Sequence, residues 1–434
     1  MNQFEKKSLL ILSAVIVFLM FFGIGGVPLL GDIEALYAKI VSNMIDSGDY
    51  LTPRLNGEVA LDNPPLYYWL AALTSNIFGI GEFAVRFPAS LMAGATAILL
   101  YFSITKIFNE CAGFWSALVL VSSMLFFGVG KFAIADSTFT FFVTGALICF
   151  LHKHYWLMYV CMAFATLTFG IAGVVLPFAI IVLYLIFMGQ LGEISCMHLI
   201  RGALLYSMLV SPWYYAMHTV HGASFVDMLF NFNAGYSSVN TFFMNGNELW
   251  YYPGVILVGM FPWTGVLLQS IKASINDSRI DDMRILMFMH IWWAFVVLFF
   301  AVCNTKSFGY IMPMFPALAI IIGWNISRMI AKLRYNTTFY SLIAKLRYNT
   351  TFYSWIVGSG IMFSLLGVGC LMVGQQFPEL EFIGLVLSGL IFVLGFAALF
   401  TLWYYRDVEM ASWLHVATGS TIMFVVFAFV LPFV

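Results

Sequence analysis

Long apolar runs separated by short polar turns dominate this chain. Each run is close to the roughly 20 residues that a helix needs to cross the hydrocarbon core of a bilayer. The pattern predicts thirteen membrane-spanning helices, over residues 8–29, 86–106, 112–130, 137–151, 155–169, 171–189, 200–219, 250–270, 285–303, 308–328, 354–374, 382–404 and 411–433. The first run is too long for the core of a signal peptide, so we expect it to remain as an anchor.

Composition agrees with this pattern. Hydrophobic residues make up 62% of the 434 residues and charged residues only 9%, whereas soluble domains carry about 25% charged residues. The sequence therefore excludes a water-soluble enzyme, a disordered chain and a nucleic-acid-binding protein. It predicts an all-α integral membrane protein with a single transmembrane domain over residues 1–434.

The distribution of basic residues predicts the orientation. With the N-terminus in the cytoplasm, fourteen Lys and Arg residues fall inside and five outside, namely Lys39, Arg54, Arg86, Lys131 and Lys306. This split follows the positive-inside rule. The cytoplasmic loop, residues 329–353, contains IAKLRYNTTFYS at 330–341 and again at 343–354. The repeat suits an interfacial segment at anionic headgroups, or it is a recent duplication without a role.

Two long segments, residues 31–85 and 220–249, face the outside in this topology. The first holds seven of the twenty acidic residues: Asp32, Glu34, Asp46, Asp49, Glu58, Asp62 and Glu82. Functional residues concentrate in such loops. We therefore expect the site in the first outer loop.

This loop also predicts two surface helices. Apolar residues recur at helical spacing over residues 33–45, and Gly48 ends that helix. A second helix begins after Pro65 and has on one face Leu66, Trp69, Leu70, Leu73 and Ile77. Both are too short or too polar to span a bilayer, so we expect them to lie on the outer membrane surface, as a shelf for a substrate that is itself a lipid.

Six stretches carry a resemblance that covers most of the chain: GDIEALYAKIVSNMIDSGDYLTPRLNGEVALDNPPLYYWLAAL (31–73), GEFAVRFPASL (81–91), KFAIADSTFTFF (131–142), SPWYYAM (211–217), ELWYYPGVILVGMFPW (248–263) and TKSFGYIMPMFPALA (305–319). They resemble the polyprenyl-phosphate-sugar glycosyltransferases of the protein O-mannosyltransferase superfamily, which include the lipid A aminoarabinose transferase. The resemblance implies a GT-C fold with about thirteen spans, surface helices in the first periplasmic loop and a cavity at the outer leaflet.

The resemblance also implies an activity and a location. Such an enzyme is an inverting hexosyl or pentosyl transferase in the bacterial inner membrane. It moves a sugar from a polyprenyl phosphate, such as undecaprenyl phosphate, to a lipid, glycan or protein acceptor at the periplasmic face. Its partners are this donor, the acceptor and membrane lipids, with no nucleic acid.

Sugar transfer needs a carboxylate that orients or deprotonates the acceptor. Asp32 and Glu34 are the candidate catalytic residues, although local sequence alone also allows an N-cap at Asp32 and a helix-dipole role for Glu34. With the resemblance, we expect Asp32 to reach the sugar from a non-helical lead-in that Gly31 permits. Glu34 would position the acceptor or a bound cation. Asp136 matches a second acidic position of the family, and its alternative role is a span-end acid paired with Lys131.

Transfer also needs positive charge to stabilise the departing lipid phosphate. Lys306 matches a family lysine, and Tyr310, one turn later, offers a hydroxyl. Arg86 and Arg54 lie in matching motifs, but either could be an interface anchor or a partner of the acidic loop. The set of candidates that bind the donor phosphate or the substrate is completed by Tyr37, Asp62, Asn63, Asp136 and Lys131.

The chain departs from the family at several polar positions. At the two positions where the family usually has an Asp-Glu pair, this chain has Ile33 and Glu34. Its aspartate, Asp32, lies one residue earlier. Where the family usually has an acidic residue followed by a lysine, this chain has Asp62 and Asn63. A second lysine of the family corresponds to Phe169. The family's His-Asn pair and its Arg in the second outer loop correspond roughly to residues 232–233 and 236 of this chain. No spaced set of metal ligands is present, so no cofactor is predicted and a divalent cation is left open. We also expect no C-terminal soluble domain.

Two other functions stay open. A secondary transporter or lipid flippase would also have many spans, but the acids cluster in one outer loop and no half-repeat is visible. A catalytically inactive family member could act as a scaffold or lipid-binding subunit, since the usual lysines are missing. Sugar transfer by the purified protein would separate these alternatives.

Overall fold

The structure is a computed structural model that describes residues 3–60, 63–223, 225, 250–276, 279–303, 306–334, 342–376, 381–405 and 407–426. Helices form nearly all of it. In chain order the elements are α1 (Gln3–Phe21), α2 (Gly31–Ser47), β1 (Arg54–Leu55), β2 (Glu58–Val59), α3 (Leu66–Phe78), α4 (Glu82–Ile107), α5 (Glu110–Val121), α6 (Met124–Lys131), α7 (Asp136–Leu151), α8 (Tyr155–Phe169), α9 (Ala172–Phe187), α10 (Glu193–Cys196), α11 (Leu199–His221), α13 (Tyr251–Gly259), α14 (Thr264–Ile275), α15 (Ile280–Val302), η1 (Gly309–Met314), α16 (Phe315–Arg334), α17 (Leu342–Gln376), α18 (Glu381–Phe400), η3 (Thr401–Tyr405) and α19 (Val408–Val425).

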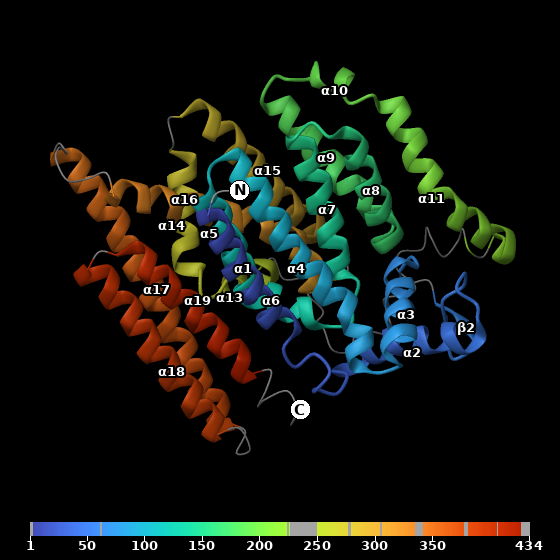
Figure 1. Cartoon of the computed structure of the whole chain (residues 1–434), viewed down its shortest axis with the longest axis horizontal. Coiled ribbons are helices and arrows are strands. Elements are labelled where there is room, and N and C mark those ends of the chain that lie inside the picture. The colour runs from blue at the N-terminus through green and yellow to red at the C-terminus, as the bar shows by residue number, and fades with distance from the viewer. Residues whose placement is uncertain are drawn as a thin grey trace.

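The bundle is built around α16. In an 18-residue apolar window of the stretch Gly309–Lys332, which η1 and α16 form, 94% of the residues are buried inside the protein. Helix α16 packs most extensively on α5, and also on α14 and α15. Figure 1 shows α17, α18 and α19 together on one side of this centre and α8 to α11 on the other. The site described below lies at one end of this centre.

Helices occupy the segments that the apolar pattern predicted as spans. Among the described residues, five helices are long and apolar enough to cross a membrane, or seven if two bent pairs each count as one span. Helices α7, α8 and α9 are apolar but shorter. The all-α membrane fold is therefore confirmed, while the count of thirteen spans stays a prediction.

Two segments that we predicted as single spans are bent. Residues 112–130 divide into α5 and α6, which meet at 63°, and residues 250–270 divide into α13 and α14, which meet at 104°. At the first bend, the hydroxyls of Ser122 and Ser123 donate to carbonyls four residues earlier, at 2.6 Å each, a bond that bends helices. At the second, Pro262 has no amide hydrogen with which to continue the helix.

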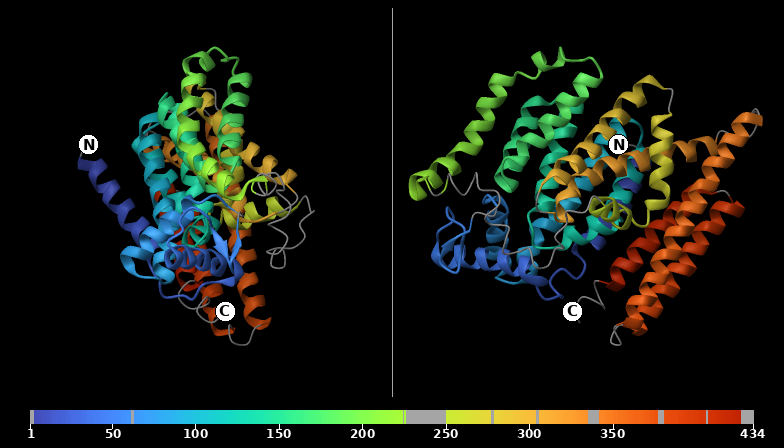
Figure 2. Two further views of the ribbon diagram at one scale, coloured as in Figure 1. Left: turned by 90° about the vertical axis from the view of Figure 1, so that its right-hand side faces the viewer. Right: turned by 180° about the vertical axis from the view of Figure 1, so that it is seen from behind.

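The outer loop folds as α2, a two-residue hairpin of β1 and β2, and α3. As predicted, α2 buries an apolar face that includes Tyr37 and Ile40, and it ends at Gly48, whose φ of +69° is the left-handed conformation of a helix C-cap. Figures 1 and 2 show α2 and α3 at one end of the bundle and α10 at the opposite end. We call these the outer-loop end and the opposite end.

The predicted apolar face of α3 is only partly buried inside the protein. Leu73 and Ile77 of that face are 57% and 65% exposed. Besides Leu66 of that face, the helix buries Tyr67, Tyr68, Ala71, Ala72 and Ser75. Small alanines let α3 approach α4 closely and the tyrosines fill the space beside them. The aliphatic ridge is left on the outside, where it is compatible with lipid.

Other predicted features lie partly outside the described residues. The second outer loop, 220–249, is described only over residues 220–223 and at Phe225. In the cytoplasmic repeat, the first copy begins in the last turn of α16, and the second copy lies in the first part of α17. The boundaries of the single transmembrane domain, and the expectation that no soluble domain follows it, stay predictions.

Candidate functional site

A buried ion pair joins the first turn of α2 to α4 at the outer-loop end. The Arg86 Nε donates to Glu34 Oε1 at 2.9 Å, and the Arg86 Nη2 donates to Glu34 Oε2 at 2.7 Å. The two residues are only 0% and 2% exposed. Two parallel N–H···O bonds match the planar guanidinium to the carboxylate, which is the strongest geometry for such a pair.

The remaining polar atoms of this pair bind backbone from two other segments, the chain between α1 and α2 and the turn between α6 and α7. Arg86 donates to the carbonyls of Ile24, Val27 and Pro28 at 2.7–2.9 Å. Glu34 accepts from the amides of Leu30 at 2.8 Å and Ala133 at 2.6 Å. The pair thus ties the chain after α1, the start of α2, helix α4 and the turn between α6 and α7. We call it the Glu34–Arg86 clamp.

Asp32 lies inside α2 and not in a lead-in, so that prediction is wrong. The helix begins at Gly31, whose φ is +66°, and its N-cap is Leu30 without a side-chain cap bond. Asp32 is therefore not the N-cap either. Two positions on a helix are about 200° apart, so Asp32 is exposed while Glu34 points into the protein.

A layer of tyrosines packs beside the clamp. The Tyr37 ring lies 5.4 Å from that of Tyr67 and 5.2 Å from that of Tyr68. Asn63 donates to the Tyr37 hydroxyl at 2.6 Å, and the Tyr67 hydroxyl donates to the Val85 carbonyl at 2.9 Å. Burial, and then the Glu34 carboxylate, raise the pKa of Tyr67. Tyr67 and Tyr68 were missed among the site residues, although both stand in the matching stretch NPPLYYW.

Asn63 is buried and held by Tyr37 at the position where the family resemblance expects a lysine. Its neighbour Asp62 lies outside the described residues. Arg54 is on β1 and pairs with Asp49 at 3.7 Å, with both side chains about 40% exposed. Arg54 thus has the surface role that the sequence left open, as a partner of the acidic loop.

Lys131 and Asp136 flank the turn that the clamp holds. The Lys131 ammonium is buried, donates to the Phe22 carbonyl at 2.7 Å and lies 4.4 Å from the centroid of the Phe127 ring. Asp136 is the first residue of α7 and is 9% exposed. Among the described residues no ion pair joins the two, so the alternative that paired them is wrong.

The Asp136 carboxylate lies against η1. A Cβ atom added at Gly309 would be 2.5 Å from Asp136 Oδ1 and 3.3 Å from Oδ2, so only glycine allows this approach. The next residue, Tyr310, packs its ring 5.5 Å from that of Phe169. Phe169, at the other missing lysine position, also stacks on Phe139 at 4.8 Å. An aromatic wall thus stands beside a carboxylate.

The segment that leads into η1 connects this carboxylate to an apolar groove. The groove, of about 510 Å³, lies between α6 and α13, and Phe308 is among its lining residues. Lys306 lies two residues earlier, is partly exposed, and forms no hydrogen bond or ion pair with the described residues. We call Asp136, Gly309, Tyr310 and Lys306 the Asp136 corner. An apolar groove, a cation and a carboxylate thus occur along one short stretch.

Metal ligands do not gather at this site. Within the part of the chain that the structure describes, no group of three or more His, Cys, Asp or Glu side chains could hold a metal ion. The carboxylate of Glu34 is occupied by Arg86 and two amides, so it has no geometry for a further cation.

Comparison with known proteins shows what the chain resembles. Residues 62–215 match the family described as "Dolichyl-phosphate-mannose-protein mannosyltransferase". An uncharacterized protein of Aquifex aeolicus is 30% identical over 324 residues, which are 73% of this chain and 63% of that protein. The undecaprenyl phosphate-alpha-4-amino-4-deoxy-L-arabinose arabinosyl transferase of Aeromonas salmonicida is 26% identical over 316 residues, which are 68% of this chain and 55% of that protein. The chain thus spans less than two thirds of the length of these relatives.

A solved structure shares the fold. ArnT from Cupriavidus metallidurans, bound to undecaprenyl phosphate, superposes with a TM-score of 0.80 at 20% sequence identity, over 96% of this chain and 76% of that one. Together, these findings show that the chain is similar to this mannosyltransferase family and to the aminoarabinose transferases, and that it has the GT-C fold.

Proposed function

We propose that this protein is a membrane glycosyltransferase that moves a sugar from a polyprenyl-phosphate donor to an acceptor at the outer-loop end. The observation that carries the proposal is that Lys306, Phe308 of the apolar groove and Gly309, which lies against the Asp136 carboxylate, follow one another within four residues of the chain. A polyprenyl-phosphate sugar has a matching part for each: a phosphate for the cation, a long hydrocarbon tail for the groove and a sugar beside the carboxylate.

The groove and Lys306 take the donor in this proposal. The isoprenoid tail lies along α6 and α13, where the walls are apolar. Lys306 then meets the phosphate, with the Tyr310 hydroxyl as a second donor. Both groups stabilise the negative charge that grows on the phosphate as its bond to the sugar breaks.

Asp136 activates the acceptor in this proposal. The acceptor oxygen attacks the anomeric carbon from the side opposite the phosphate, its proton passes to the Asp136 carboxylate, and the lipid phosphate leaves with the bonding electrons. A single displacement of this kind inverts the anomeric carbon. Asp32, exposed on the outer side of α2, guides the incoming acceptor. Glu34 and Arg86 act as positioning residues, because their polar atoms are already occupied.

The relatives support undecaprenyl phosphate as the carrier. The Aeromonas relative is named for an undecaprenyl phosphate sugar, and the Cupriavidus structure holds undecaprenyl phosphate. We therefore propose an aminosugar or other small sugar on this carrier and an envelope lipid such as lipid A as the first acceptor to test, before glycan or protein acceptors. The site would face the periplasm of a bacterial inner membrane, with the N-terminus in the cytoplasm.

A second candidate is a catalytically inactive lipid-binding subunit. The observation in its favour concerns the two positions where the family resemblance expects lysines. Asn63 occupies one and donates to the Tyr37 hydroxyl, and Phe169 occupies the other and packs in the aromatic wall. Such a protein would keep the groove without transferring a sugar.

One experiment separates the two. The purified full chain is reconstituted with radiolabelled undecaprenyl-phosphate aminoarabinose and lipid A, and transfer is followed by thin-layer chromatography. A transferase labels the acceptor and loses that activity in Asp136→Asn. A donor that binds without any transfer, across aminosugar and hexose donors, would instead support the inactive subunit.

A further inference from the structure

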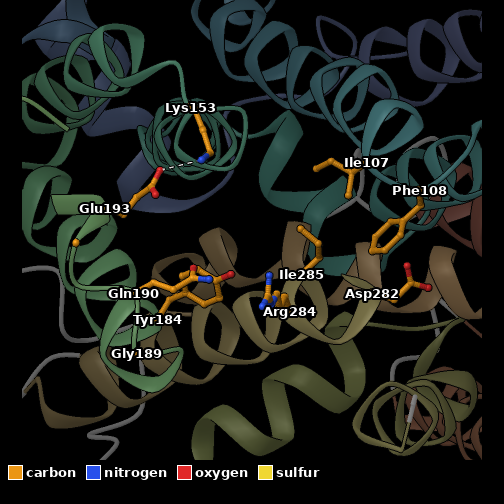
Figure 3. Close-up of a pocket in the computed structure, with 11 residues that line it drawn as sticks. Ile107, Phe108, Lys153, Tyr184, Gly189, Gln190, Glu193, Asp282, Arg284 and Ile285 are labelled. Carbon is orange, nitrogen blue, oxygen red and sulfur yellow. Dashed lines mark ion pairs between the residues drawn. The ribbon is translucent and has the colours of Figure 1, made fainter. Parts of the chain in front are cut away.

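A second polar site lies at the opposite end of the bundle, where Figure 1 shows α10 far from α2 and α3. A depression of about 770 Å³ is lined by Lys153 from the turn before α8, Glu193 of α10 and Arg284 of α15 (Figure 3). A second depression, of about 460 Å³, shares Ile107 and Phe108 with the first. We call the two together the cationic pocket.

Basic side chains outnumber acidic ones in the cationic pocket. Its charged lining residues are Lys153, Arg279, Arg284, Arg328, Lys332, Glu193 and Asp282. Both acids are already paired, because the Lys153 Nζ lies 3.1 Å from Glu193 and the Arg279 Nη2 lies 2.6 Å from Asp282. The pocket therefore keeps an excess of positive charge that its own acids do not neutralise.

Arg284 is the side chain best placed to take a ligand. It is exposed and forms no hydrogen bond or ion pair in the described part of the chain. Figure 3 shows its guanidinium directed into the pocket, between Tyr184 and Ile285. A guanidinium without a partner can give two parallel N–H bonds to one phosphate.

The cationic pocket also has an apolar wall. Ile107 and Phe108 line both depressions at the end of α4, and Ile285 lies across from them (Figure 3). Helices α4, α9 and α16 end here and α15 begins here. In a bundle that crosses a bilayer, such helix ends lie at headgroup depth, where a lipid presents both a charged head and the start of its hydrocarbon chains.

We infer that the cationic pocket binds the phosphate headgroup of an anionic phospholipid such as phosphatidylglycerol. Arg284 contacts the phosphate, the surplus positive charge holds it, and an acyl chain lies on the wall of Ile107 and Phe108. Basic pockets between helices at a membrane surface recognise anionic headgroups in this way. This ligand is a resident lipid at the end of the bundle that is remote from the donor groove.

The test measures which lipids stay on the purified full chain. Native mass spectrometry compares phosphatidylglycerol with phosphatidylcholine, which has a phosphate but no net charge, and inorganic phosphate is added as a competitor. The wild type should retain phosphatidylglycerol preferentially. Arg284→Gln should weaken retention about fivefold, and Arg284→Gln with Arg328→Gln about 25-fold, since each cation contributes about a fivefold factor.

Lys272→Gln is the matched control. Lys272 is exposed in the last turn of α14 at the same end but is not among the residues that line the pocket, so its loss should leave retention unchanged. The inference is overturned if Arg284→Gln retains phosphatidylglycerol like the wild type while folded, if both lipids are retained equally, or if inorganic phosphate displaces the lipid, which would indicate a free-anion site. No sugar donor is present, so the outcome does not depend on transferase activity.

Discussion

The Glu34–Arg86 clamp and the Asp136 corner lie close together in the fold but use their polar atoms differently. In the clamp, the guanidinium and both carboxylate oxygens are bonded to each other and to five backbone groups. In the corner, the Asp136 carboxylate lies against a glycine, and Lys306 has no described partner. A completed network fixes geometry, whereas groups with unused bonding capacity can act on a substrate. We therefore expect mutations in the clamp to affect stability first, and mutations in the corner to affect turnover first.

The largest effect should come from Arg86→Met. This change leaves the Glu34 carboxylate buried without its counter-charge, and breaking a buried pair in this way costs about 3–5 kcal/mol. Thermal unfolding in detergent should show a much lower midpoint and loss of the monodisperse peak in gel filtration. Arg54→Met is the control, because its pair with Asp49 is exposed and is worth about 0.2–1 kcal/mol. Equal midpoints for the two variants would mean that the clamp does not hold the outer loop.

Asp136→Asn should have the opposite profile. The amide keeps the size of the carboxylate but cannot accept the acceptor's proton, so turnover should fall about 10²–10⁴-fold while the unfolding midpoint stays within a degree or two. The measurement is single-turnover transfer with saturating donor, together with a donor-binding assay. A variant that transfers at the wild-type rate would remove Asp136 from the chemistry.

Lys306→Met tests the donor half of the same corner. Loss of the ammonium should raise the donor concentration needed for half-maximal rate and lower turnover, because the cation contacts the phosphate both before and during its departure. Folding should be unaffected, since Lys306 is partly exposed. Unchanged donor binding in this variant would make Lys306 an interface anchor only.

The difference between the two regions also explains what the sequence could predict. Helices α2 and α3, and the end of α2 at Gly48, follow from apolar periodicity and a C-cap residue, which are local signals. The clamp joins residues 52 apart in the chain, and nothing local indicates that Glu34 and Arg86 pair. The bends at Ser122–Ser123 and Pro262 were missed because each lies inside an apolar run of the length that a span needs.

The candidate site residues also differ in how far the sequence could predict them. Asp136 and Lys306 became candidates because they stand in motifs that resemble the family's, and so does Tyr310. The roles of Asp32 and Glu34 depended on where α2 begins, and a shift of a residue or two in a helix start is beyond what local sequence determines. Asp32 was expected before the helix and lies within its first turn. Contacts such as that of Asp136 with Gly309 require the packed structure.

Gly309→Ala probes the packing of the corner without removing a functional group. The new methyl would overlap the Asp136 carboxylate, which must then move. A displacement of about 1 Å in a catalytic group can cost about 10²-fold in rate, so turnover should fall while donor binding at Lys306 is kept. Gly389→Ala, in α18, is a matched control, because a Cβ there meets nothing within 4 Å and Gly389 does not line the groove. Equal activity of both alanine variants would show that the position of Asp136 is not critical.

The smallest effect is expected from Asp32→Asn. Asp32 is exposed on the outer side of α2, about 200° around the helix from Glu34, so it can guide an acceptor but is not held against the donor. Its neutralisation should raise the acceptor concentration needed for half-maximal rate a few-fold, with turnover at saturating acceptor nearly unchanged. Kinetics with varied acceptor measure both quantities, and Asp46→Asn, on the same helix, serves as the control for a general loss of negative charge. If Asp32→Asn abolishes turnover while Asp136→Asn keeps it, then Asp32 is the base and α2 must move toward the groove when the donor binds.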